Sequence, residues 1–210
     1  MCHAASVERR IAAVVFDLGG VLTPPVFGPL DELNDSLGLP EGTLRSFFRG
    51  DEVFAQVERG EVSFRDFLKS VGTRVQAAHG LRLDLRALAA AVEAPGHLEP
   101  AMVDLVRRLH GDGLRLGLLT NNAKESVVWR ETLPRECFDV VVDSSEVGLR
   151  KPDPRIYALA LERLGLPADQ VLYVDDFAEN LPPAADLGMR TWSFDGRDRL
   201  DAFLRGVVTP

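Results

Sequence analysis

An acid followed by two glycines ends the first apolar run of the chain. Asp17 comes directly after residues 14–16, Val-Val-Phe, and Gly19 and Gly20 follow it closely. An apolar run without polar alternation predicts a strand buried on both faces, and open α/β sheets bind ligands at the carboxyl ends of their strands. A turn acid that merely ends the strand is the alternative for this segment alone. Asp17 is therefore a candidate carboxylate for nucleophilic or metal chemistry.

Two further segments offer groups that could hold an anion. Thr120 and Asn121 follow the apolar run 116–119, where a hydroxyl and backbone N–H groups before a helix could bind an anion. An ordinary helix N-cap is the alternative. Lys151 lies in a loop that two prolines stiffen, although a lysine alone is usually a surface residue.

Adjacent carboxylates end another apolar run. Asp175 and Asp176 follow residues 171–174, and a solvated acidic turn is the alternative there. Neighbouring carboxylates at a buried strand end repel each other unless a cation lies between them and Asp17. Oxygen ligands without thiolate or imidazole suit Mg²⁺. These three acids supply −3, while Mg²⁺ and Lys151 supply +3, which leaves a neutral cradle for a phosphate dianion.

The elements that must position these residues are strands alternating with helices. Such a rhythm predicts an α/β fold with a Rossmann-like, doubly wound parallel sheet, in which all four segments meet at one edge. Apolar periodicity predicts strands at 14–16, 114–120, 138–143, 171–174 and 189–194, and helices at 102–109, 126–133, 156–164, 181–187 and 200–204.

A second region interrupts this rhythm after the first strand. From residue 30 to residue 94 the apolar residues recur at helical spacing, and no strand pattern is present. The sequence therefore predicts an α/β core formed by residues 1–23 and 95–210, with a helical bundle inserted at residues 24–94.

Composition limits the partners of the chain. Its 210 residues carry a net charge of −8, which would repel nucleic acid and anionic membranes. No apolar run reaches the roughly 18 residues of a membrane span, and the first ten residues lack the apolar core of a secretory signal. The two cysteines, Cys2 and Cys137, form no disulfide framework. We expect a cytoplasmic protein without nucleic-acid or membrane partners.

Four segments resemble, in this order, the motifs of the haloacid dehalogenase superfamily. They are Asp17-Leu-Gly-Gly-Val-Leu, Thr120-Asn121, Lys151-Pro152 and Asp175-Asp176. The resemblance covers nearly the whole chain, and the inserted bundle resembles that family's helical cap. The segments 148–154 and 175–180 are most similar to phosphatases related to the amino-terminal domain of soluble epoxide hydrolase.

The resemblance implies a Mg²⁺-dependent phosphatase that acts on a small phosphorylated metabolite. Asp17 would be the nucleophile and form an aspartyl-phosphate. Asp17, Asp176 and the backbone carbonyl of Gly19 would ligate Mg²⁺, and Asp175 would bind the ion directly or through water.

The resemblance also assigns the groups that hold the substrate. Thr120 and the backbone of Asn121 would bind the phosphoryl oxygens, and Lys151 would neutralise both the nucleophile and the phosphate.

One position departs from the family pattern. Gly19 replaces an aspartate whose side chain protonates the leaving oxygen and activates water, which is help worth about 10² to 10⁴-fold in rate. Substrates with good leaving groups, such as sugar 1-phosphates or acyl phosphates, would be least affected. The alternative is a non-catalytic or weakly active protein that binds a phospho-ligand. A third hypothesis is a C–halogen hydrolase, which needs no metal and leaves Asp175 and Asp176 unexplained.

Overall fold

Strand β1 (Ala13–Phe16) lies at the centre of a five-stranded parallel sheet in the computed structural model, which describes residues 11–207. The strand order is β3-β2-β1-β4-β5, which confirms the predicted doubly wound α/β class. The other strands are β2 (Arg115–Thr120), β3 (Val140–Asp143), β4 (Val171–Asp175) and β5 (Arg190–Ser193).

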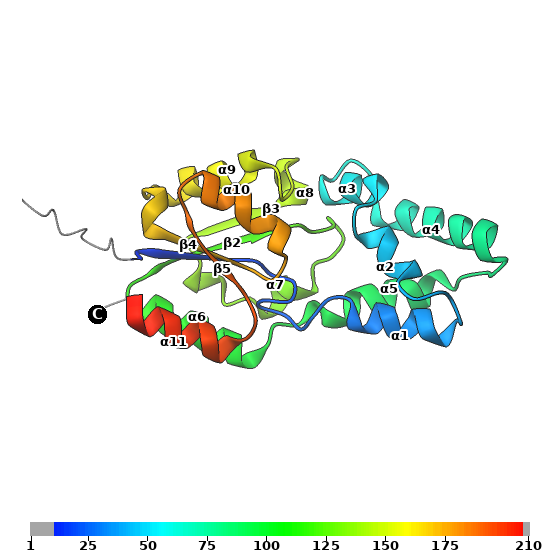
Figure 1. Cartoon of the computed structure of the whole chain (residues 1–210), viewed down its shortest axis with the longest axis horizontal. Helices are drawn as coiled ribbons and strands as arrows, with labels where there is room; N and C mark the ends of the chain where they lie inside the picture. Colours follow the sequence, from blue (N-terminus) through cyan, green and yellow to red (C-terminus); the bar gives the residue numbers. More distant parts are fainter. Residues whose placement is uncertain (1–10, 208–210) are drawn as a thin grey trace, which may run out of the picture.

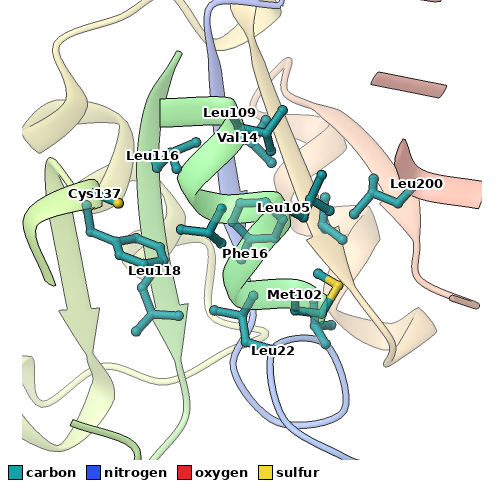
Figure 2. Packing of buried hydrophobic residues seen from close by; sticks show 14 of the residues in the cluster. Val14, Phe16, Leu22, Met102, Leu105, Leu109, Leu116, Leu118, Cys137 and Leu200 are labelled. Carbon is teal, nitrogen blue, oxygen red and sulfur yellow. The ribbon is translucent and has the colours of Figure 1, made fainter. Parts of the chain in front are cut away.

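Helices α6 (Pro100–Gly111) and α11 (Arg197–Val207) cover one face of the sheet (Figure 1). Side chains alternate along a strand, so that every second residue of β1 points to this face. Val14 and Phe16 are fully buried there, in one apolar cluster with Leu105 of α6 (Figure 2).

Helices α9 (Pro154–Leu164) and α10 (Leu181–Asp186) cover the opposite face. The other residues of β1, Ala13 and Val15, belong to a second cluster that includes Tyr157 of α9. Both faces of β1 are therefore buried, which explains why this strand has no polar alternation.

Five helices follow β1 and lie beyond the carboxyl ends of the strands (Figure 1). They enclose a separate apolar cluster around Phe67. Ser63 is the N-cap of the longest of them, because its hydroxyl accepts the Asp66 N–H at 3.1 Å. The five are α1 (Gly28–Ser36), α2 (Thr43–Phe48), α3 (Glu52–Glu58), α4 (Phe64–His79) and α5 (Leu85–Glu93).

Several predicted helices differ in length from the observed ones, and the helix expected at 102–109 is the longer α6. The helix expected at 126–133 is only α7 (Val128–Thr132), because the Ser126 carbonyl accepts Asn122 Nδ2 and Trp129 Nε1, each at 3.0 Å, instead of a helical N–H. The helix expected at 200–204 is the longer α11.

Short helices complete the chain. None of them was predicted. They are α8 (Ser144–Val147), η1 (Ala94–Gly96), η2 (Arg135–Cys137), η3 (Ala168–Gln170) and η4 (Ala178–Asn180).

Within residues 11–207, every helix is too short or too polar to cross a membrane. Cys137 is buried as a free thiol, and Cys2 lies outside the described residues.

Truncation of Leu105 should destabilise the whole fold. Leu105 is 1% exposed at the interface between α6 and the sheet, so Leu105→Ala should lower the free energy of unfolding by about 2–5 kcal/mol. Urea denaturation measures this loss. Val127→Ala, at a position that is 48% exposed, is the control and should change it by less than about 0.5 kcal/mol. Equal losses in the two variants would contradict the core assignment.

Candidate active site

Three carboxylates meet where β1 and β4 end. The Asp17 N–H donates to the Val174 carbonyl at 2.8 Å, which aligns Asp17 with the end of β4. Asp17, Asp175 and Asp176 each offer an oxygen within 4.8 Å of the other two. Parallel pairing of β1 with β4 therefore brings together the acids that the sequence places far apart.

Lys151 lies between two of these acids. Its Nζ is 2.7 Å from Asp17 Oδ1 and 2.9 Å from Asp175 Oδ2, and the side chain is only 1% exposed. Burial raises the pKa of Asp17 to about 7 against the opposing effect of Lys151. Burial alone would lower the pKa of Lys151, but the two carboxylates outweigh it and raise this pKa above its ordinary value. The lysine is therefore a fixed positive charge.

Asn121 and Thr120 lie at the end of β2, beside Lys151. The Asn121 side chain donates to the Lys151 carbonyl at 3.0 Å and accepts the Lys151 N–H at 2.8 Å. This double hydrogen bond fixes the lysine backbone, a role that the sequence did not predict. Thr120 is buried, and its hydroxyl donates to the Asn121 carbonyl over a long distance of 3.3 Å.

Asp175 is surrounded by donors. Its Oδ1 accepts the Phe177 N–H at 2.8 Å, and Asn180 Nδ2 lies 3.1 and 3.0 Å from the two oxygens. The Tyr173 hydroxyl and Lys151 Nζ both donate to Oδ2. The protein itself therefore satisfies this carboxylate.

Asp176 differs sharply from its neighbour. Its Oδ1 is buried and has no hydrogen-bond partner among the residues that the structure describes. Burial and the charge of Asp175 raise the pKa of Asp176 to about 6. An unpartnered carboxylate oxygen close to Asp17 fits a bound cation, and an all-oxygen donor set fits Mg²⁺. These acids could therefore hold a metal ion.

Gly19 and Gly20 form the turn that follows Asp17. Gly20 has a φ of 75°, and a Cβ there would strike the Asp176 carboxylate. Only glycine combines this left-handed backbone with so close an approach. Gly20 therefore allows the turn to pack directly on Asp176.

Two tyrosines support the site. Tyr173 lies two residues before Asp175 on the same strand face, so period-two alternation could have revealed it. Tyr157 of α9 donates to the Asn180 carbonyl at 2.8 Å and packs edge-to-face on Tyr173. No sequence signal marks Tyr157, because its position depends on how α9 packs.

A family model described as haloacid dehalogenase-like hydrolase matches residues 11–188. The chain is similar to phosphatase MT3486 of Mycobacterium tuberculosis, with 31% identity and 88% of each chain covered. It is also similar to bifunctional epoxide hydrolase 2 of Sus scrofa, with 29% identity over 86% of this chain. The first mammalian relatives that it matches are much longer, and the chain spans 18–36% of their length.

Among solved structures, the fold is similar to that of a HAD family enzyme from Bacteroides thetaiotaomicron in complex with magnesium and inorganic phosphate. The TM-score is 0.72 at 23% identity, over 92% of this chain and 99% of that one. The predicted family and its likeness to the epoxide hydrolase phosphatases are confirmed.

Burial of the Asp176 carboxyl should make the stability of the metal-free protein depend on pH. The pKa of Asp176 is raised to about 6 in the folded state, so near pH 5 the folded protein binds a proton that the unfolded chain does not. Protonation therefore favours the folded state at low pH, and this stabilisation is lost as pH rises through about 6. In EDTA, Asp176→Asn should therefore be more stable than wild type at pH 7.5, and this advantage should vanish near pH 4. Urea denaturation across this range measures the difference, and a constant difference would contradict the burial effect.

Proposed function

The chain belongs to the haloacid dehalogenase-like hydrolase family, and from this premise we propose that it is a Mg²⁺-dependent phosphatase. Its substrate would be a small phosphorylated metabolite, cleaved through an aspartyl-phosphate on Asp17. The observation that carries the proposal is Lys151, held between Asp17 and Asp175 beside the unpartnered oxygen of Asp176. Three carboxylates against one lysine leave two negative charges, which a divalent cation would balance.

Asp17 and Asp176 would hold Mg²⁺, together with the backbone carbonyl of Gly19. Asp175 would act on the ion directly or through water, because its oxygens already accept protein donors. When bound, Mg²⁺ neutralises the charge of the phosphate and polarises its oxygens.

The remaining steps belong to the protein's own residues. Two donors, the Leu18 N–H at 2.6 Å and Lys151 Nζ at 2.7 Å, fix the Asp17 carboxylate through Oδ1. This preorganisation favours attack on phosphorus. Thr120 and the Asn121 backbone would hold the phosphoryl oxygens, while Lys151 balances charge on both sides of the transferred group. The cap, residues 24–94, would select the leaving group.

Gly19 favours a second candidate function, the binding of a phosphorylated ligand without turnover. The position carries no side chain that could protonate a leaving oxygen. Attack on a C–halogen bond fits the site poorly, because that chemistry has no use for a cation between Asp17 and Asp176.

Loss of the nucleophile should remove catalysis without loss of the fold. Asp17→Asn keeps the shape of the side chain, and we expect phosphate release to fall by more than about 10³-fold. The assay uses a broad panel of phosphorylated metabolites with Mg²⁺. The matched control is Asp186→Asn, on the exposed surface of α10, which should keep full activity. Full activity in Asp17→Asn would overturn the proposal.

Mg²⁺ should stabilise the protein through Asp176. A ligand present at 100 times its dissociation constant contributes about 2.7 kcal/mol, so saturating Mg²⁺ should raise the thermal midpoint. Asp176→Asn should lose most of this shift, and Asp186→Asn should keep it. An equal shift in both variants would place the metal elsewhere.

Tight binding of inorganic phosphate by calorimetry, without turnover of any substrate, would favour the second candidate function.

A further inference from the structure

We infer that Val26 occupies the place of the absent leaving-group acid, and that this restricts the site to phosphoryl compounds whose leaving group departs without a proton. Acyl phosphates are the biological class that fits best, because a carboxylate is a stable anion. The inference rests on the proposed phosphatase function and names the substrate class of that same site.

The space at position 19 carries the inference. A Cβ built on Gly19 would lie 2.9 Å from Val26 Cγ1, closer than real side chains approach. Gly19 is not among the glycines with a left-handed backbone, so its conformation itself would accept a side chain. Val26 is the obstacle, in contrast to Gly20, whose backbone demands glycine.

The turn that carries Val26 is held in place. The ring of Phe27 packs edge-to-face on Phe177 at a centroid distance of 6.1 Å, and Phe177 follows Asp176 directly. The guanidinium of Arg45 lies 4.9 Å from the centroid of the Phe27 ring. These contacts hold Phe27, the residue next to Val26, against the segment that follows Asp176.

Other acids described near the site are engaged elsewhere. Glu58 of the cap is buried and accepts Arg150 Nε at 2.6 Å. Glu179 pairs with Arg49 at 2.9 Å. Asp175 is held by its own donors. None of these three carboxylates is free to take over the role of an acid at position 19.

The chemistry balances without such an acid. In the first step an Asp17 oxygen forms a bond to phosphorus, the bond to the leaving oxygen breaks, and that oxygen departs with the electron pair as an anion. In the second step water attacks phosphorus, the aspartyl oxygen is released as carboxylate, and both protons of the water leave with dihydrogen phosphate. The first step is then limited by the stability of the leaving anion.

The test is a series of phosphoryl compounds, one acyl phosphate and three phosphate esters, graded by the acidity of the leaving group. Acetyl phosphate, nitrophenyl phosphate, phenyl phosphate and an alkyl phosphate are assayed with Mg²⁺. We expect kcat/KM for wild type, which reports the first step alone, to fall steeply along the series. Gly19→Asp with Val26→Ala should flatten the dependence and raise turnover of the alkyl ester by about 10² to 10⁴-fold. Gly19→Asn with Val26→Ala is the matched control, because it fills the same space without an acid and should keep the steep dependence.

The outcomes separate the inference from the function on which it rests. If wild type releases phosphate from no member of the series, acetyl phosphate included, the proposed phosphatase function fails. If wild type cleaves all members with a shallow dependence, the function stands and the inference is overturned, because another group then supplies the proton. The inference is also overturned if the Gly19→Asp, Val26→Ala protein keeps the steep dependence of the matched control.

A measurement without substrate tests whether Val26 fills the space beside Gly19. In metal-free protein, Gly19→Asn alone should lower the thermal midpoint, and adding Val26→Ala should recover part of the loss, a coupling that a double-mutant cycle detects. Additive effects of the two substitutions would show that Val26 does not occupy this space, which would overturn the inference.

Discussion

Three carboxylates crowded at one edge of a buried sheet are the constraint on which the rest of the structure depends. Asp17, Asp175 and Asp176 lie close enough to share one ion, and burial makes their negative charge costly. Lys151 compensates part of it from a position held by Asn121. The remaining deficit of two positive charges suits a divalent cation, which in the proposed function would in turn hold a phosphate.

The two adjacent aspartates differ in what compensates their charge. Asp175 accepts hydrogen bonds from Tyr173, Asn180 and the Phe177 backbone as well as from Lys151. Its negative charge is therefore compensated by groups of the protein, which it holds in place. The buried Oδ1 of Asp176 accepts no hydrogen bond from any residue that the structure describes. A buried acceptor without a partner is costly unless something binds it, so Asp176, rather than Asp175, is the acid better suited to bind a metal ion.

The sequence predicts the polar residues at the strand ends, but not the residues that hold them in position. Asp17, Thr120, Lys151 and the aspartate pair could be foreseen, because parallel strands bring their carboxyl ends to one edge. The class of the sheet followed from apolar periodicity in the same way. Tyr157 could not be foreseen, since its contact with Asn180 depends on how α9 packs. The short α7 likewise reflects competition for the Ser126 carbonyl, which no local propensity encodes.

Gly19 and Gly20, which follow Asp17, are glycines for different structural reasons. Gly20 is required by its backbone and by the carboxylate of Asp176, whereas Gly19 is required only by a neighbouring side chain. In the proposed phosphatase, the carboxylate, the lysine and the acids for a metal would serve the nucleophilic step. The group that Gly19 lacks would act only on the leaving oxygen and on water. Under that proposal, selection among substrates would come from leaving-group chemistry as much as from the shape of the inserted helices, residues 24–94.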